Sequence, residues 1–291
     1  MKDTKIAWTD HTFNPWMGCT KVSPACANCY AERDMDKRWG RVSWGPSEKL
    51  TKNRMGLSLW GPDSERQRTK SPWKNVRRWN RAAADEGVVA KVFTGSLMDW
   101  AEDHPQAKEY RPKMWEVIRE CQHLHFQMLT KRTERIAECL PTDWGDGYPN
   151  VWIGTTIEDN RVAHRQQYLA ETPAVCRFVS YEPAIGPLNE MPLDGVDWLI
   201  YGGESGPGHR PEDKQWARDI RDRCFAEGIA FFHKQSSGYR TEMGIELDGE
   251  LIRQFTIPRE FAGVFRNAGT GLVRAKSVRK RASSERLEVN T

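Results

Sequence analysis

The chain has 291 residues, of which 38% are hydrophobic and 29% are charged, and its formal net charge is +4. This is the composition of a globular protein, and no segment approaches the roughly 18 consecutive apolar residues that predict a membrane span. The first residues lack the basic region and apolar run of a secretory signal. We therefore expect a soluble, cytoplasmic protein with no membrane partner and one main domain over residues 1–238.

Three closely spaced cysteines, Cys19, Cys26 and Cys29, follow a short predicted strand at 12–16. Six residues separate the first pair and two separate the second, so the thiolates can converge on zinc, copper or an iron–sulfur centre. A structural zinc ion normally needs four protein ligands. Three cysteines instead suit a 4Fe-4S cluster with one open iron. A structural metal site, with His11 or a distant cysteine as the fourth ligand, stays open as the alternative.

Residues 41–71 contain Gly, Pro, Ser and many charges without apolar periodicity, which predicts a long loop or lid. Beyond them, short apolar runs alternate with amphipathic segments, the pattern of parallel strands covered by helices. The pattern predicts an α/β fold that is a partial or full parallel (β/α) barrel, although an open doubly wound sheet has the same signature. The predicted strands are 88–93, 125–129, 151–155, 176–180, 198–201 and 229–233, and the predicted helices are 106–121, 133–140, 160–171 and 214–227.

The C-terminal part of the chain predicts two additions to the barrel. Residues 238–256 indicate a hairpin around Asp248 and Gly249, because Asp-Gly favours a tight turn, and this extension is placed at 239–260. Residues 261–291 are polar and basic, which is typical of a flexible tail.

Four further cysteines stand singly in apolar or helical contexts, where a free cysteine behaves as a small hydrophobic residue. We expect structural roles for Cys121, Cys139, Cys176 and Cys224.

Polar or charged residues follow six consecutive predicted strands. Any one of them could be a helix cap, but catalytic groups of parallel barrels collect at the carboxyl ends of the strands, so together they favour an active-site mouth. These residues are Ser96, Asp99, Lys131, Thr156, Glu158, Glu182, Glu204, Ser205 and Lys234.

Seven of the thirteen tryptophans lie in the first eighty residues, interleaved with Lys and Arg. Stacking on nucleobases is one explanation. Packing around the barrel mouth is the interpretation that we favour. They are Trp8, Trp16, Trp39, Trp44, Trp60, Trp73 and Trp79.

Several segments between about residues 5 and 238 resemble a phage and bacterial family called Gp37/Gp68 or DUF5131. They are WTDHTFNPWMGC, CANCYAER, QMLTKR, VSYEPAIGPL, YGGESGP and FFHKQ. The family is related in pattern to spore photoproduct lyase, which implies a radical S-adenosylmethionine type of barrel. The six-residue gap after Cys19 departs from the usual motif of such enzymes, which has three residues there.

The resemblance implies a 4Fe-4S cluster on the three cysteines and S-adenosylmethionine as the second cofactor. An external reductant such as flavodoxin would supply the electron. Lys131 could hold the carboxylate of S-adenosylmethionine, since an ammonium is a suitable point-charge partner. Glu204 could bind its amino group or ribose, and Glu182 could bind cofactor or substrate. Ser96 completes the candidate cofactor-binding residues.

Some phage relatives act in thymidine hypermodification, which implies an isomerase that converts N-linked glycinyl-thymidine to C-linked glycinyl-thymidine. Its substrate would be DNA or a modified nucleotide in the host cytoplasm, and the product would protect viral DNA from restriction. Two alternatives stay open. One is a non-catalytic nucleic-acid-binding protein with a structural zinc ion or cluster, and the other is a DNA repair enzyme like spore photoproduct lyase, which would need a hydrogen-atom relay such as a reactive cysteine.

Overall fold

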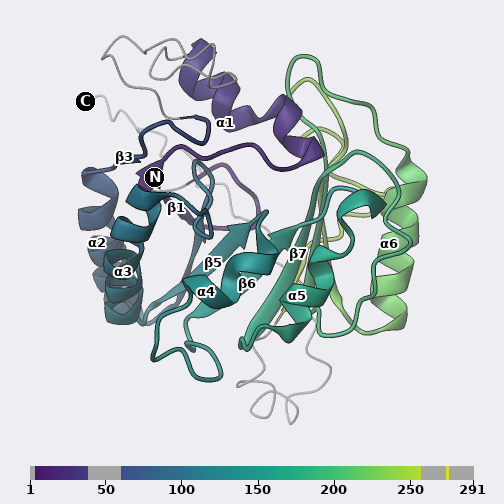
Figure 1. The fold of residues 1–291 in the computed structure, drawn as a ribbon. Coiled ribbons are helices and arrows are strands. Elements are labelled where there is room, and N and C mark those ends of the chain that lie inside the picture. The colour runs from purple at the N-terminus through teal and green to yellow at the C-terminus, as the bar shows by residue number, and fades with distance from the viewer. Residues whose placement is uncertain (1–3, 39–59, 257–272, 275–291) are drawn as a thin grey trace, which may run out of the picture.

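A computed structural model describes residues 4–38, 60–256 and 273–274 of the chain. Seven parallel strands form one sheet in which each strand pairs with its neighbours in chain order. A doubly wound sheet would reverse its order at a switch point. The sheet is therefore a curled half-barrel, which confirms the predicted partial parallel barrel (Figure 1). The strands are β1 (His11–Phe13), β4 (Ala90–Thr94), β5 (Leu124–Thr130), β6 (Val151–Thr156), β7 (Cys176–Ala184), β8 (Trp198–Gly203) and β9 (Ala230–Gln235).

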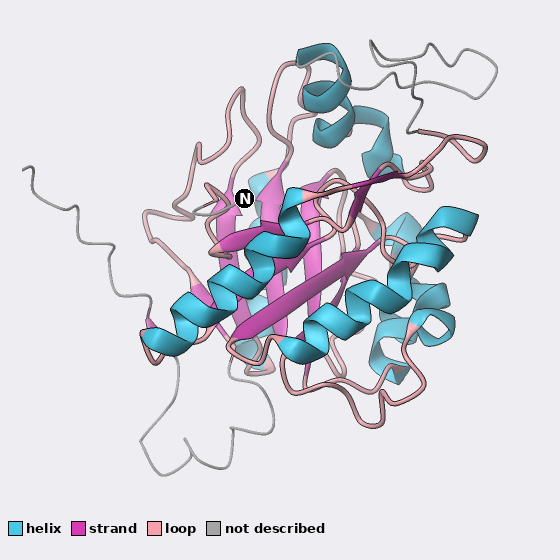
Figure 2. Cartoon of the chain, turned by 90° about the vertical axis from the view of Figure 1, so that its left-hand side faces the viewer, coloured by secondary structure: helices cyan, strands magenta, loops and turns pink. Residues whose placement is uncertain are grey.

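The helices cover the outer face of the half-barrel, and Figure 2 shows two long helices, α2 and α3, lying across the strands. The helices of this layer are α2 (Ser71–Asp85), α3 (Pro105–Glu120), α4 (Ile136–Cys139), α5 (Arg165–Glu171) and α6 (Lys214–Ala226). The cysteine segment contributes β2 (Trp16–Met17), η1 (Pro24–Asn28), α1 (Tyr30–Glu32) and η2 (Arg33–Arg38). Smaller elements are β3 (Gln67–Arg68), η4 (Thr133–Arg135), η5 (Asn160–Val162), β10 (Gln254–Phe255) and β11 (Val273–Arg274).

Helix α2 lies where no helix is expected from the sequence. Its buried side chains, Trp73, Val76, Trp79 and Ala83, are spaced by three or four residues and form one face, which is the periodicity that could have revealed it. Five of the seven N-terminal tryptophans are described by the structure, and their exposed fractions lie between 0% and 8%. For these five, packing rather than open stacking on nucleobases is correct. Trp39 and Trp44 lie outside the described residues.

The inner face of the half-barrel carries a second hydrophobic core, which is largely aromatic. Trp152, Phe178, Trp198 and Phe232 point inward from the first halves of their strands and pack together beneath Trp8. This layer fills the amino-terminal half of the interior. The carboxyl half is left for polar side chains.

The predicted hairpin around residues 248–249 is reduced to its turn. Asp248 and Gly249 have the positive φ angles of a tight turn, but only Leu247 and Glu250 pair across it. The second arm instead pairs with the open edge of β9, where the His233 N–H donates to the Ile252 carbonyl at 2.7 Å. An edge strand has unpaired backbone groups that recruit such a segment.

Two further predicted segments lie partly outside the described residues. Of the predicted lid at 41–71, residues 41–59 are not described, and the remainder includes β3 and the start of α2. Of the predicted tail at 261–291, only β11 is described. No helix in the described parts of the chain is long and apolar enough to cross a membrane.

Candidate functional site

A cavity of about 270 Å³ lies at the carboxyl edge of the strands, between the inner face of the sheet and the cysteine segment. Its apolar side includes Ile6, Trp8, Phe93 and Leu129. The polar side brings together all seven residues that the sequence suggests as cluster or cofactor ligands. They are Cys19, Cys26, Cys29, Ser96, Lys131, Glu182 and Glu204.

Strand alternation explains why the charged residues of this set point inward. Side chains two positions apart share a face of a strand. In β7, Phe178 belongs to the inner core, so Glu182 shares its face. In β9, Phe232 belongs to the inner core, so Lys234, two residues later, lies on the same inner face of the strand. The same parity places Lys131, two residues after Leu129, on the inner side of β5.

The cavity-facing charges differ in how they are neutralised. Lys234 and Glu182 form an ion pair across the interior. The ammonium of Lys131 donates to the Thr156 hydroxyl at 3.3 Å, and no carboxylate of the described residues lies within ion-pairing distance of it. Burial lowers the pKa of Lys131, but the charges of Cys26, Glu158, Cys29 and Asp99 together outweigh burial and raise the pKa above its ordinary value. Lys131 therefore presents a cation to the cavity.

Buried ion pairs hold the backbone just after Cys19, at the start of the cysteine segment. Glu102 accepts two hydrogen bonds from Arg66, at 2.7 and 2.8 Å, and one from the Thr20 amide at 2.6 Å. On the other side, Arg132 donates to Asp99 at 2.8 Å and to the Thr20 carbonyl at 2.7 Å. Both backbone groups of the residue after Cys19 are thus fixed by side chains from the ends of β4 and β5.

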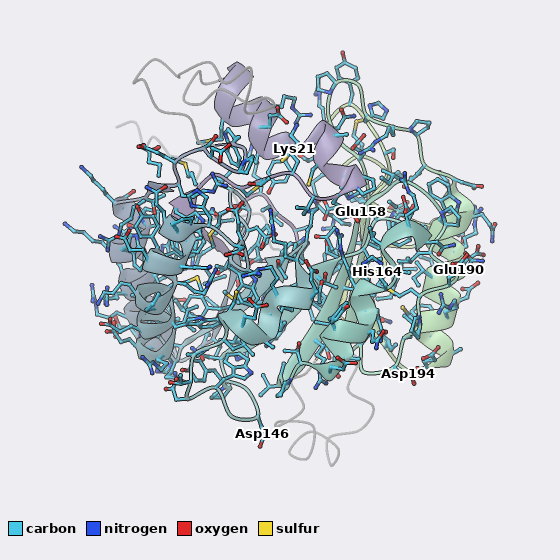
Figure 3. The ribbon with its side chains drawn as sticks, viewed as in Figure 1. Lys21, Asp146, Glu158, His164, Glu190 and Asp194 are labelled. Carbon is cyan, nitrogen blue, oxygen red and sulfur yellow. The ribbon has the colours of Figure 1, made fainter. Side chains whose placement is uncertain are left out.

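A second contact holds the six-residue loop between Cys19 and Cys26. The Ser23 hydroxyl donates to Glu158, which also receives Arg165 at 3.0 Å. The Arg165 and Glu158 side chains are 5% and 0% exposed. Figure 3 shows Glu158 just below the N-terminal segment, whereas Asp146 and Asp194, which precede their strands, lie at the opposite end of the sheet.

A third contact holds Asn28, which lies between Cys26 and Cys29. The Asn28 side chain donates to Glu204 at 3.1 Å. Arg210 also binds Glu204, and it donates to the Pro24 carbonyl at 3.1 Å. Glu204, expected to contact a cofactor, therefore has both carboxylate oxygens engaged by protein groups. Its position is that of a support for the cysteine segment.

Ser96 is engaged in a similar way. Its hydroxyl accepts a hydrogen bond from the Asn14 amide at 2.7 Å, and its carbonyl accepts one from the Tyr30 hydroxyl at 2.7 Å. The strand-end residues thus fall into two groups. Ser96, Asp99, Glu158 and Glu204 hold the cysteine segment, and the Ser205 carbonyl binds Arg33 of that segment. The others form two separate pairs that face the cavity, Lys131 with Thr156 and Glu182 with Lys234.

The four single cysteines lie away from the cavity. Cys121, Cys139 and Cys224 are buried in the outer core, and Cys176 is buried in the inner core. His11, the other candidate for a fourth ligand, stacks on the Trp79 ring with centroids 4.4 Å apart. None of these five side chains lines the cavity.

The donor set can be compared with the two kinds of centre that the sequence suggests. Among the described residues, no three His, Cys, Asp or Glu side chains are arranged to hold a single metal ion. Cysteines that bind a four-iron cluster bind different irons, so their sulfur atoms do not converge on one point. Cys19, Cys26 and Cys29 are partly exposed and all line the cavity, as the ligands of a cluster with an open iron would.

Several residues of the site carry no recognisable sequence signal. Arg66, Arg132, Arg165 and Arg210 each reach the cysteine segment from a distant part of the chain, and Glu102 lies beyond the strand end that the pattern marks. Arginines are common on protein surfaces. Only their ion pairs with acidic residues, which are buried for Arg66, Arg132 and Arg165, identify these arginines as supports of the site.

The fold and the site define an α/β protein with a parallel half-barrel and a cysteine-lined cavity at the carboxyl edge of its strands. The family model described as protein of unknown function (DUF5131) matches residues 3–289. The chain belongs to this family, as its segments predict. No curated protein and no solved structure has a significant match to it.

Proposed function

We propose that this protein is a radical S-adenosylmethionine enzyme whose 4Fe-4S cluster is held by Cys19, Cys26 and Cys29. The observation that carries the proposal is the position of the three cysteines. They follow the first strand of a parallel half-barrel and line the cavity at the carboxyl edge, where enzymes of barrel fold have their active sites. The step from this position to radical chemistry is an analogy at the level of the fold.

In this proposal the protein supplies position and shielding. A cluster with S-adenosylmethionine at its open iron supplies, once reduced by a donor such as flavodoxin, the radical that abstracts hydrogen from the substrate. Lys131 binds the carboxylate of S-adenosylmethionine, because it is the cation of the cavity without a carboxylate partner among the described residues. The aromatic layer below excludes water from the reacting groups.

The reaction that we propose is the isomerisation of N-linked to C-linked glycinyl-thymidine in phage DNA, which would protect that DNA from host restriction. Two features of the cavity support an amino-acid-bearing base. Glu182 and Lys234 offer adjacent negative and positive charges that complement an ammonium and a carboxylate. Phe93 and Leu129 offer apolar surface for a base.

The alternatives make different demands on the cavity. A DNA repair enzyme like spore photoproduct lyase would need a further, reactive cysteine in the cavity. Among the described residues, the cysteines that line the cavity are the three proposed ligands. A non-catalytic nucleic-acid-binding protein would need a centre with all its coordination positions filled, so that it does not bind S-adenosylmethionine.

Anaerobic reconstitution tests the proposal. We expect bound iron and the visible absorption of a cluster, followed by release of 5′-deoxyadenosine when reductant and S-adenosylmethionine are added. Substitution of Cys19, Cys26 or Cys29 by Ala abolishes both, whereas the matched control Cys121→Ala retains them. Stoichiometric zinc without iron, or a cluster that never cleaves S-adenosylmethionine, contradicts the proposal. Mass analysis of nucleosides from treated phage DNA then tests the glycinyl-thymidine reaction.

A further inference from the structure

A second hollow adjoins the cavity on the outside of the rim. It measures about 490 Å³ and is lined by loop residues that follow β8 and β9 and by the start of η2. Four residues, Arg33, Asp34, Ser205 and Thr241, line both hollows, so the two are continuous. The inner cavity, at about 270 Å³, is smaller than most ligand sites. A polynucleotide substrate would therefore extend over this rim.

The rim loop, residues 236–244, is held rigidly at both ends. The Ser236 amide donates to the carbonyls of Met243 and Gly244, both at 2.9 Å. The loop is also tied to the one after β8, because the Gly238 amide donates to the Glu204 carbonyl at 3.0 Å and its carbonyl accepts from Gly206 at 2.9 Å. A loop fixed in this way lowers the backbone part of the ordering cost on binding.

Two side chains on this loop have no structural role that explains their exposure. The Tyr239 side chain is 65% exposed, and its aromatic neighbour among the described residues is the His209 ring, edge-on at 6.3 Å. Arg240 is exposed and forms no ion pair with a described carboxylate. By contrast, the next charged residue of the loop, Glu242, is paired with Arg253 at 2.8 Å.

A second arginine faces the same hollow from the cysteine segment. Arg33 donates to the Ser205 carbonyl at 3.2 Å and packs against Gly206, where a Cβ atom would lie 2.0 Å from its Nη1. It also pairs with Asp34 at 3.3 Å, which offsets the one acidic side chain that lines this hollow. The hollow thus combines an exposed ring, two guanidinium groups and backbone from a glycine-containing loop.

We propose that this hollow is a subsite for the nucleotide that adjoins the one in the inner cavity, so that the substrate is a polynucleotide rather than a free nucleotide. The inference rests on the proposed function. Tyr239 stacks on the neighbouring base, and Arg240 with Arg33 binds the phosphate between the two nucleotides. Aromatic stacking with phosphate binding by arginine is the recurring chemistry of unpaired nucleic-acid strands.

Fluorescence anisotropy of the full-length protein tests this subsite without requiring catalysis. The probe is a labelled oligothymidylate of about ten nucleotides, a length within the usual range for single-strand sites. We expect Tyr239→Ala to weaken binding at least about fivefold. Arg240→Ala should reduce the slope of log affinity against log salt by about 0.7, the value for one lost phosphate contact with a single strand.

The matched controls are Tyr168→Ala on α5 and Arg81→Ala on α2, both exposed and away from the rim. They should bind as the unchanged protein does. Equal affinity for Tyr239→Ala and the unchanged protein overturns the subsite, as does displacement of the probe by thymidine monophosphate as readily as by unlabelled oligonucleotide. The same measurement with labelled oligouridylate shows whether the subsite prefers DNA or RNA.

Release of 5′-deoxyadenosine is measured on the same variants. If oligothymidylate binding does not depend on Tyr239 while S-adenosylmethionine is still cleaved, only the proposed subsite is contradicted. If no variant cleaves S-adenosylmethionine but oligothymidylate binding still depends on Tyr239, the proposed radical chemistry is contradicted and the subsite is retained.

Discussion

The guanidinium of Arg66 and the carboxylate of Glu102 form two hydrogen bonds of 2.7 and 2.8 Å, with side chains only 0% and 3% exposed. Glu102 also receives the amide of Thr20, the residue after Cys19. A buried ion pair adds little net stability over a hydrophobic pair, but the loss of one partner leaves an uncompensated charge. Loss of this ion pair should therefore both destabilise the fold and displace the backbone next to Cys19.

For Glu102→Ala we expect the free energy of unfolding to fall by about 3–5 kcal/mol, because the buried Arg66 guanidinium loses the Glu102 carboxylate that binds it with two hydrogen bonds. The double variant Arg66→Met with Glu102→Leu should recover most of that loss. Neither variant restores the acceptor for the Thr20 amide, so both should bind less iron on reconstitution. Urea unfolding and iron analysis measure the two effects, and an unchanged stability of Glu102→Ala would contradict this account.

Lys131→Met should weaken S-adenosylmethionine binding about tenfold or more, since a hydrogen bond to a charged group contributes about 1.5–3 kcal/mol. Iron binding should persist, because Lys131 is not expected to bind the cluster. Lys131→Arg keeps the charge and should retain part of the affinity. Equilibrium dialysis with labelled S-adenosylmethionine measures the change.

The control for this prediction is Lys234→Met, which removes a cavity-facing lysine that is already paired with Glu182. Its S-adenosylmethionine affinity should stay closer to that of the unchanged protein. Equal losses in the two variants would mean that Lys131 has no special role in holding the carboxylate.

Gly154 provides the space for the Phe178 ring in the inner core, because a Cβ atom at this position would lie 2.3 Å from a ring carbon. Gly154→Ala should lower stability by about 1–3 kcal/mol, the usual cost of overpacking. Adding Phe178→Leu makes room and should recover part of that loss. Thermal unfolding of the single and double variants tests the coupling, and purely additive losses would argue against it.

The free energy of unfolding should decrease as the pH falls, because His125 binds a proton more readily in the unfolded chain than in the folded one. Burial, with a smaller contribution from Lys91, lowers the pKa of His125 from 6.5 to about 4. Between these values the unfolded chain binds more protons at this site than the folded chain does, so stability decreases as pH falls. The contribution lost between about pH 7 and pH 5 is about 2 kcal/mol.

The matched variant is His125→Phe, which keeps a ring beside Trp152, whose centroid lies 5.4 Å from that of His125, and removes the titrating group. Urea unfolding at both pH values should show a smaller acid-induced loss for this variant. A pH dependence identical to that of the unchanged protein would assign the effect to other groups.

Strand order and the inward direction of the cavity residues could be predicted from the sequence to a large extent. Apolar runs separated by amphipathic segments mark β4 to β9 within a few residues, because parallel strands buried on both faces have that composition. Period-two alternation then places Glu182 and Lys234 on the face of the inner core. Helix α2 was equally accessible through the spacing of its buried residues.

The division of labour among the strand-end residues could not be predicted in this way. Glu204 and Lys131 are both polar residues after a strand, yet Glu204 is occupied by Arg210 and Asn28, whereas Lys131 faces the cavity. The difference depends on contacts between residues far apart in the chain, which local pattern does not encode.

By itself, the sequence determined the family, the parallel α/β architecture and the close spacing of the three cysteines, because composition and spacing are local properties. Only the tertiary structure decided that those cysteines line one cavity together with Lys131. It also decided that buried arginines hold the segment between them and that Tyr239 and Arg240 line the hollow beside the cavity. Burial removes water from these charges and makes each long-range pairing a structural requirement.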